Sequence, residues 1–589
     1  MKTIVGSPDR EENGTGNSHH LLFIPMIMQA HFASAIRLAE KLSARGLKIT
    51  IVTISKHAES LNKIYTPEGL LKLGLTVEVV EDPKIDPKLP GAWSPLNVAK
   101  CMEESCRPLQ QRLLGKKKAG SPYPTCMLAD RFFTWSKEYA EQLDIPRYAY
   151  VSYAAVTTRL MQVYHEFEDD LRQIPDGPDW QRDWYEIFHG KPGLEFLSSA
   201  SDLPGVSRSS GWFDFLIEIG RNICTADGVV MNSFSELESK AVEAIRNGSP
   251  GSRRQKPPDR TCRNSACFML LPVGSPERQD GVLESPQGER QPADTDIHPG
   301  LNLLFYGLDL AFAFGVLGSD AAGGGRQCSA QHCAFDWGRS LSVAEVQATR
   351  VFPIGPISDL RSFRNESYVS NTDDSHAECM EWLEKQPTKS VLYVCLGSQV
   401  VLEKEQIGHL ARALDASQQT FLWVLSKGRG NFNIPDDVLP EGFLTRTCGR
   451  GLVVTGWVGQ LQVLAHPSVV GFVSHCGWQS VIESMTCGVP IIGWPQGYDQ
   501  HFNCRYVQQV LKAGIGIRDV DNTALVVDQL EFENAFKLFS PEKLGKALAF
   551  NAASFDRKAA AAVSRGGSSD KAIDDLIESI KQPREVNEN

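Results

Sequence analysis

The chain has 589 residues, and its 60 Lys and Arg against 71 Asp and Glu give a formal net charge of −11. With 42% hydrophobic and 22% charged residues, it has the composition of an ordinary globular protein, and its length predicts more than one domain. The acidic balance argues against a nucleic-acid surface, which needs a basic patch, so any anion site must be local.

The start of the chain, residues 1–18, is polar and acidic and lacks the apolar segment of a secretory signal. The 14 cysteines are scattered, and several, such as Cys126, Cys395 and Cys476, lie inside apolar runs. Scattered cysteines in apolar runs are typical of reduced thiols, so we expect a cytoplasmic protein. We expect the polar residues 1–18 to form a disordered N-terminus.

Short apolar runs alternate with helical patterns through the first 246 residues, which predicts an α/β fold with a parallel sheet. A helix after the first run has its apolar residues on one face and Gly46 as its stop. That face consists of Phe32, Ala35, Ile36, Ala39 and Leu42. We expect strands at 21–25, 48–54, 76–81, 126–130, 148–153 and 228–234.

Residues 247–349 are rich in Gly, Pro, Ser and charge, a composition that predicts a disordered insert. Its origin is open between a retained non-coding segment and a lineage-specific insertion. The apolar stretch 301–318 is long enough for a membrane span, but Asp309 at its centre and two glycines favour no span. The pairs Cys262/Cys267 and Cys328/Cys333, with His332 nearby, lack the regular spacing of zinc ligands.

A second α/β series follows, with a strand at 391–398 and further strands in FLWVLS, GLVVTGWV, VVGFVSH and VPIIGWP. The helical stripe after the first of these strands is Ile407, Leu410, Ala411 and Leu414, and a last helix carries Ile573, Leu576, Ile577 and Ile580. Two doubly wound halves predict a ligand between them, at the carboxyl ends of the strands.

Residues 457–500 contain most of the candidate chemistry of the second half. The segment 474–480, SHCGWQS, follows a strand and should open a helix, whose free N–H groups suit a diphosphate. Glu483 lies one turn after Ser480, where a carboxylate accepts from a ribose diol, although a helix-capping role fits equally. Trp457 offers a flat face to a base.

This segment resembles the signature box of plant family 1 UDP-glycosyltransferases in length and register, and QAHFASAIRLAEKL resembles the first strand–helix unit of that family. The resemblance covers about residues 19–246 and 350–582. It implies the GT-B fold, in which two Rossmann-like domains face each other across a cleft. We expect an acceptor domain at 19–246, the insert at 247–349, a UDP-sugar domain at 350–565, and at 566–589 a helix that packs back on the first domain, followed by a tail.

The resemblance also implies roles for individual residues. His31 corresponds to the catalytic base, and Asp130 to the carboxylate that orients it and stabilises the imidazolium. The UDP-sugar residues would be Ser398, Trp457, Val458, Gln460, His475, Gly477, Trp478, Gln479, Ser480, Glu483, Tyr498, Asp499 and Gln500, and Phe132, Phe133 and Trp135 could line an acceptor pocket.

The implied reaction is an inverting transfer of a hexose from its UDP-sugar to a hydroxyl of a small lipophilic acceptor of phenolic, flavonoid or terpenoid type. The resemblance implies glucose, because in that family a Gln at the position of Gln500 goes with this sugar. No DxD pair is seen near the box, so we expect neither metal nor cofactor. We also expect a monomer. Gln479 stands where the family usually has Asn, and Gly459 where it usually has Pro.

Two alternatives remain at this point, and a third is disfavoured. One is a UDP-sugar-binding protein whose catalysis is weak or lost because of the insert and Gln479. Another is a membrane-tethered transferase or scaffold anchored by residues 301–318. A dinucleotide oxidoreductase is disfavoured, because no GxGxxG follows the first strand.

Overall fold

In this computed structural model, residues 19–582 are described with gaps at 65, 86–93, 175–179, 201–202, 204–211, 249–348, 358–373, 398–399, 401, 426–437, 457 and 519–525. Both cysteine pairs, the apolar stretch 301–318, Ser398 and Trp457 lie outside these residues. Within the described residues, no helix has the length and apolar character needed to cross a membrane.

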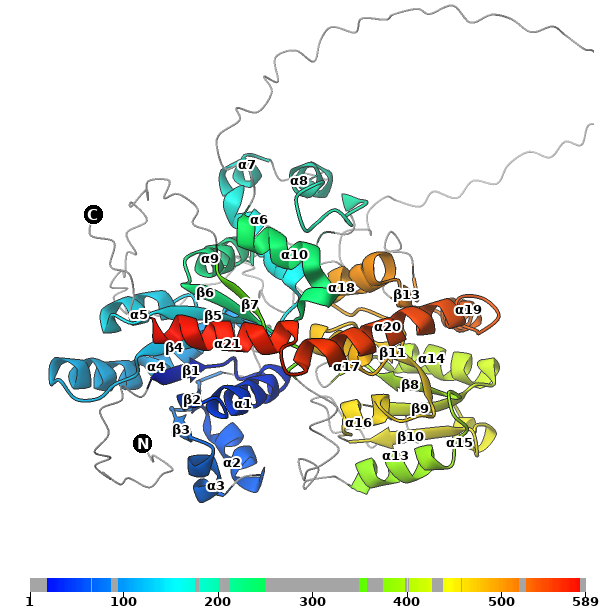
Figure 1. The fold of residues 1–589 in the computed structure, drawn as a ribbon. Helices are drawn as coiled ribbons and strands as arrows, with labels where there is room; N and C mark the ends of the chain where they lie inside the picture. Colours follow the sequence, from blue (N-terminus) through cyan, green and yellow to red (C-terminus); the bar gives the residue numbers. More distant parts are fainter. Residues whose placement is uncertain are drawn as a thin grey trace, which may run out of the picture.

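The first half forms a parallel sheet of seven strands in the order β3-β2-β1-β4-β5-β6-β7 (Figure 1). Its strands are β1 (His20–Ile24), β2 (Lys48–Thr53), β3 (Leu75–Val79), β4 (Cys126–Asp130), β5 (Arg147–Val151), β6 (Gly228–Met231) and β7 (Val351–Pro353). Although β7 follows the insert, it pairs with β6, so the structure places it in the first sheet and not with the second series.

The second half forms a parallel sheet of six strands in the order β10-β9-β8-β11-β12-β13. Its strands are β8 (Val391–Cys395), β9 (Thr420–Leu425), β10 (Gly451–Thr455), β11 (Val469–Ser474), β12 (Ile491–Gly493) and β13 (Gly514–Gly516). The predicted α/β class with two parallel, doubly wound sheets is confirmed, although several strands end earlier than their apolar runs.

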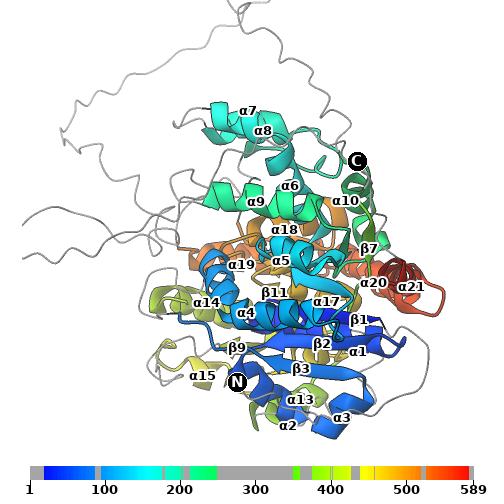
Figure 2. The same cartoon turned by 90° about the vertical axis from the view of Figure 1, so that its left-hand side faces the viewer.

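Helices connect the strands and cover both sheets (Figures 1 and 2). Those of the first half are α1 (Gln29–Ser43), α2 (Ser55–Ile64), α3 (Pro67–Lys72), α4 (Pro95–Lys118), α5 (Ser136–Leu143), α6 (Ala155–Glu166), α7 (Glu168–Gln173), α8 (Trp180–Phe188), α9 (Trp212–Cys224) and α10 (Ser235–Asn247). Those of the second half are α13 (Asp374–Glu384), α14 (Lys404–Ser417), α15 (Phe443–Arg446), α16 (Gln460–Leu464), α17 (Trp478–Thr486), α18 (Gln500–Tyr506), the π-helix η4 (Val507–Leu511), α19 (Gln529–Leu538), α20 (Gly545–Val563) and α21 (Ser568–Lys581).

The last helix, α21, lies on the first sheet beside α1, after α20 has crossed from the second half (Figure 1). Its apolar stripe is buried in one cluster with the stripe of α1 and with Leu21 and Phe23 of β1. The stripes were visible in the sequence because both helices bury residues at a period of 3.6. Helix α21 therefore packs against the sheet of the first half.

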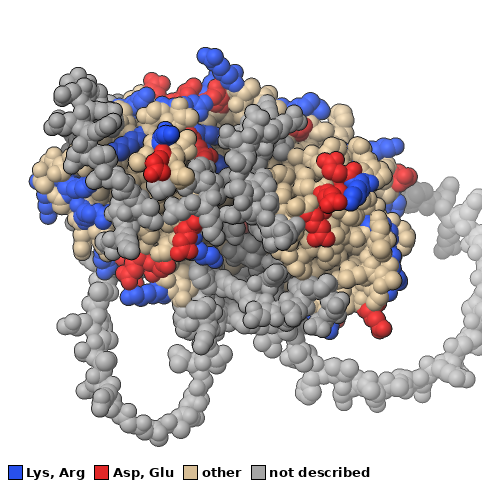
Figure 3. All heavy atoms as spheres, turned by 90° about the horizontal axis from the view of Figure 1, so that it is seen from below, with Lys and Arg blue, Asp and Glu red and all other residues tan. Residues whose placement is uncertain are grey.

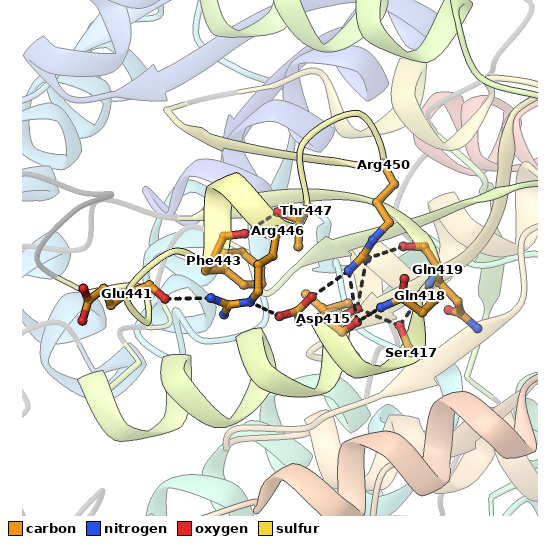
Figure 4. A network of polar contacts seen from close by, with 10 residues as sticks. Asp415, Ser417, Gln418, Gln419, Glu441, Phe443, Arg446, Thr447 and Arg450 are labelled. Atoms are coloured by element: carbon orange, nitrogen blue, oxygen red, sulfur yellow. Dashed lines mark hydrogen bonds and ion pairs between the residues drawn. The ribbon is translucent and has the colours of Figure 1, made fainter.

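A polar network fixes the outer edge of the second sheet, before the loop that leads to Val458 (Figure 4). The Asp415 carboxylate, near the end of α14, accepts from Arg446 Nε at 2.6 Å and from Arg450 Nη2 at 2.8 Å. Arg450 also donates to the carbonyls of Leu414 and Gln419. The network ties α14 to the segment that enters β10.

The charged side chains on the face shown in Figure 3 are of both signs. Among the residues that the structure describes there, Lys and Arg are interspersed with Asp and Glu rather than gathered in one basic patch. This distribution fits the acidic net charge of the chain.

Candidate functional site

The structure brings His31, in the first turn of α1, together with Asp130, the last residue of β4. His31 Nδ1 lies 3.3 Å from Asp130 Oδ2, and the Asp130 carboxylate also accepts the backbone N–H of Phe132 at 3.2 Å. The Asp130 side chain is 1% exposed and that of His31 12%. Parallel strands β1 and β4 are neighbours, so the elements that follow them meet at one edge of the sheet.

A third group, Ser152, contacts the same ring nitrogen. Its Oγ lies 2.8 Å from His31 Nδ1 and comes from the segment directly after β5. Within the described residues, His31 Nε2 has no hydrogen-bond partner, so one side of the imidazole is held and the other is open. The sequence analysis missed Ser152, although its position after a strand of the same sheet could have indicated it.

Aromatic rings surround the imidazole. The ring of Tyr153 meets it edge-on at a centroid distance of 5.2 Å, and Phe132 lies at 6.4 Å. Phe133 and Trp135, also predicted for an acceptor pocket, contact each other with ring centroids 5.4 Å apart and the planes tilted by 31°, and Trp135 stacks on Tyr139 of α5. Of the three predicted pocket residues, Phe132 is therefore the one that the structure places against His31.

Arg131 is a buried cation beside this group that the sequence analysis did not consider. Its guanidinium carbon lies 3.9 Å from the centre of the Tyr153 ring. Burial lowers the pKa of Arg131, while Tyr153, Asp130 and Asp499 oppose the shift. Nε and Nη1 are buried with no hydrogen-bond partner among the described residues. Because its neighbours include Asp499, Arg131 connects the acceptor side to the donor side.

On the donor side, Gly477 precedes the first turn of α17 and His475 lies just before it. Burial lowers the pKa of His475 to about 4, so the ring is neutral near pH 7. A Cβ on Gly477 would lie 2.5 Å from His475 Nε2, and one on Gly397, whose φ is +77°, would lie 3.0 Å from Cε1. Both glycines are required for this close packing.

The predicted ribose carboxylate, Glu483, is already hydrogen-bonded. Gln460 Nε2 donates to its Oε2 at 2.7 Å and to Ser480 Oγ at 3.0 Å, and Gln479 Nε2 donates to its Oε1 at 2.8 Å. Burial raises the pKa of Glu483, and the two amides oppose that shift. The structure thus brings four of the predicted donor residues into one network.

Asp499 and Gln500 lie at the start of α18. The Asp499 carboxylate accepts from Asn503 Nδ2 at 2.8 Å, and burial raises the pKa of Asp499. Gln500 Oε1 accepts the backbone N–H groups of Gln496 and Gly497 at 2.8 and 3.1 Å, so its oxygen holds the loop. Tyr498 is 62% exposed, and Val458 is buried.

Asn232, directly after β6, connects the two halves at α17. Its carbonyl accepts the indole N–H of Trp478 at 2.9 Å, and its Nδ2 donates to Gln479 Oε1 at 2.9 Å. Trp478 is 3% exposed. The sequence analysis missed Asn232, and in this structure Trp478 and Gln479 both contact it.

The sequence of this chain is similar to a known protein family and to several characterised relatives. Residues 355–543 match the family model described as "UDP-glucoronosyl and UDP-glucosyl transferase". UDP-glycosyltransferase 13 of Pueraria montana var. lobata is 27% identical over 482 residues, which cover 79% of this chain and 82% of that protein. UDP-glycosyltransferase 88B1 of Stevia rebaudiana is 40% identical over 232 residues, 39% of this chain and 47% of that protein.

Solved structures share the fold. Medicago truncatula UGT71G1, complexed with UDP-glucose, has a TM-score of 0.66 at 21% identity, with 96% of this chain and 98% of that chain covered. A UGT transferase from Siraitia grosvenorii in complex with UDP also scores 0.66, at 22% identity, with 96% and 100% covered. The fold is therefore that of the GT-B glycosyltransferases. The family model and the relatives together support a plant family 1 UDP-glycosyltransferase, and the enzyme class that they support is UDP-glycosyltransferase.

Proposed function

We propose that the protein transfers glucose from UDP-glucose to a hydroxyl of a small lipophilic acceptor, with inversion at the anomeric carbon and His31 as general base. The observation that carries the proposal is the one-sided support of His31, whose Nδ1 faces Asp130 and Ser152 while Nε2 has no partner in the described residues. A Nδ1–H that donates to the carboxylate leaves the lone pair on Nε2, the form that a base requires.

In the proposed reaction, Nε2 takes the proton of the acceptor hydroxyl as its oxygen attacks the anomeric carbon. The bond from that carbon to UDP breaks on the opposite face, which inverts the configuration. Asp130 stabilises the imidazolium that forms. The backbone N–H groups at the start of α17 would face the departing diphosphate, and the neutral His475 could add one ring N–H but no full charge.

The donor assignment rests on the buried network around Glu483. Its carboxylate oxygens keep free lone pairs beside the two amide donors, so a ribose diol could join without displacing them. Asp499, and Gln500 through its remaining N–H groups, would contact the sugar. Trp457 and Ser398 stay predictions for the base and the diphosphate, and we propose no metal in the reaction.

The acceptor class is supported by the aromatic surroundings of His31 and by the names of relatives. A phloretin 2'-O-glucosyltransferase of Pyrus communis is 34% identical over 252 residues, and a scopoletin glucosyltransferase of Nicotiana tabacum is 23% identical over 586 residues. Phe132 and Tyr153 would provide apolar surface for such an acceptor.

The test is release of UDP from UDP-glucose with a panel of flavonols, simple phenols and terpenoid alcohols, for wild type and His31→Ala. We expect acceptor-dependent release, with kcat lowered about 10²- to 10⁴-fold in the variant, and an unchanged affinity for UDP by calorimetry. Wild-type protein that binds UDP but releases none with any acceptor would favour the UDP-sugar-binding alternative. UDP-xylose and UDP-glucuronic acid in the same assay test the preference for glucose.

A further inference from the structure

We propose that Asn232 and Gln479 form a positioning pair that holds the donor-binding helix α17 against the acceptor half during transfer. The inference rests on the proposed function, since it concerns a donor bound at α17. Asn232 comes from the first half, after β6, and Gln479 from the first turn of α17. Their side chains meet directly, with Asn232 Nδ2 donating to Gln479 Oε1 at 2.9 Å.

Asn232 is fixed by contacts on every side. Its backbone N–H donates to the carbonyl of Val151 at 2.9 Å. Its Oδ1 accepts the N–H of Ile357 at 3.1 Å, and its carbonyl accepts the Trp478 indole N–H at 2.9 Å. The residue is fully buried. A buried amide with all these bonds made has one orientation, because any other would leave polar groups unpaired.

Gln479 is engaged at both ends of its amide. The oxygen accepts from Asn232, and Nε2 donates to Glu483 Oε1 at 2.8 Å. An Asn at this position would be shorter by one methylene, about 1.5 Å. From the same backbone position, the shorter side chain would not span both partners. The longer side chain in this protein therefore links the proposed ribose carboxylate to the acceptor half.

Such a link matters because the reacting groups come from different halves. His31 holds the acceptor from the first half, while α17 and α18 would hold the donor from the second. The attacking oxygen and the anomeric carbon must approach to about 3–3.5 Å, and a 1 Å misplacement can cost about 10²-fold in rate. A residue pair that fixes one half against the other should therefore affect kcat more than UDP affinity.

The experiment is a double-mutant cycle with Gln479→Asn, Asn232→Ala and the double variant. The matched control is Tyr506→Phe, which removes another bond between the halves, from Tyr506 Oη to the carbonyl of Leu237 at 3.0 Å. We expect each single variant to lower kcat about 10-fold, the double variant to be no worse than the poorer single, and UDP affinity to change less than about threefold. The control should stay within about twofold of wild-type kcat.

Two results in this cycle would contradict the proposed role of Asn232 and Gln479 as a positioning pair. One is a double variant whose loss equals the product of the two single losses, because independent residues multiply. The other is a Tyr506→Phe variant that loses as much as Gln479→Asn, because any contact between the halves would then have the same effect.

A second measurement needs no turnover and so separates this inference from the proposed function. The backbone N–H of Ile357 donates a hydrogen bond to Asn232 Oδ1. With UDP bound, hydrogen exchange of this amide should be faster in Gln479→Asn than in wild type, and as slow as in wild type in Tyr506→Phe. If wild type proved inactive, the exchange result alone would decide. Equal protection of Ile357 in wild type and Gln479→Asn would reject the pair.

Discussion

The acceptor and donor sides of the site differ in how their polar groups are satisfied. On the acceptor side, His31 Nε2 and two nitrogens of Arg131 have no hydrogen-bond partner within the described residues. On the donor side, Gln460 and Gln479 each donate a hydrogen bond to the carboxylate of Glu483. The acceptor side thus leaves His31 Nε2 available for proton transfer, whereas the donor side is an organised network that a substrate would join at low ordering cost.

The largest effect should follow from removing the charge behind His31. In Asp130→Asn, an amide replaces the carboxylate, so it stabilises neither the Nδ1–H tautomer nor the imidazolium. We expect kcat to fall about 10²- to 10⁴-fold with UDP affinity unchanged, measured by initial rates and calorimetry. Asp227→Asn is the control, because that carboxylate accepts the backbone N–H of Arg147 at the start of β5, away from the carboxyl edge. Full activity of Asp130→Asn would contradict the proposed role of Asp130 in supporting His31 as the base.

A buried carboxylate supports the acceptor side and should make its stability depend on pH. Glu238 accepts the N–H groups of Ala155 and Val156 at 2.9 and 3.0 Å and thereby caps α6, close to Ser152. Burial raises the pKa of Glu238 from 4.5 to about 7. Between these values the unfolded chain releases the proton and the folded protein keeps it, so the contribution is full below pH 4.5 and is lost as pH rises to about 7.

That loss amounts to about 3 kcal/mol. Urea midpoints of wild type and Glu238→Gln at pH 5 and pH 7.5 measure it. The difference between the two proteins should be smaller at pH 7.5, because only wild type carries the titrating group. Parallel pH dependence in both proteins would contradict the assignment.

On the donor side, Glu483→Ala should separate the two substrates. Losing a carboxylate that accepts from a ribose should raise KM for UDP-glucose about 10- to 100-fold, whereas KM for the acceptor should change less than about twofold. Thermal unfolding of the variant monitors the loss of the Gln460 and Gln479 contacts. A comparable rise in both KM values would mean that Glu483 serves the structure and not the ribose.

The sequence predicted the part of this molecule that depends on local pattern. The buried stripe of α1 and the strands β4 and β8 follow from periodicity and apolar runs. That His31 and Asp130 meet follows from the resemblance together with the shared edge of parallel strands. The prediction placed the three-residue strand β7 in the second half, whereas it pairs with β6 of the first sheet. So short a strand has no sequence pattern that indicates which strand it pairs with.

The contacts that the sequence did not predict are made over long separations. Asn232 and Gln479 are 247 positions apart, and Ser152 and His31 are 121 apart. No period or spacing encodes such pairs. The direction in which an amide points depends on every donor and acceptor around it, so the orientation of Gln479 needed the folded arrangement.

The smallest expected effect, that of Ser152→Ala, tests the acceptor side most finely. Ser152 Oγ is nearer to His31 Nδ1, at 2.8 Å, than Asp130 Oδ2, at 3.3 Å. If Nδ1–H donates to both oxygens, Ser152 assists the carboxylate, and its loss should lower kcat about two- to fivefold. If instead the serine hydroxyl donates to Nδ1, it favours the tautomer with hydrogen on Nε2, which cannot act as a base. We expect the decrease, and a kcat that rises in Ser152→Ala would show that Ser152 competes with Asp130 for the tautomer of His31.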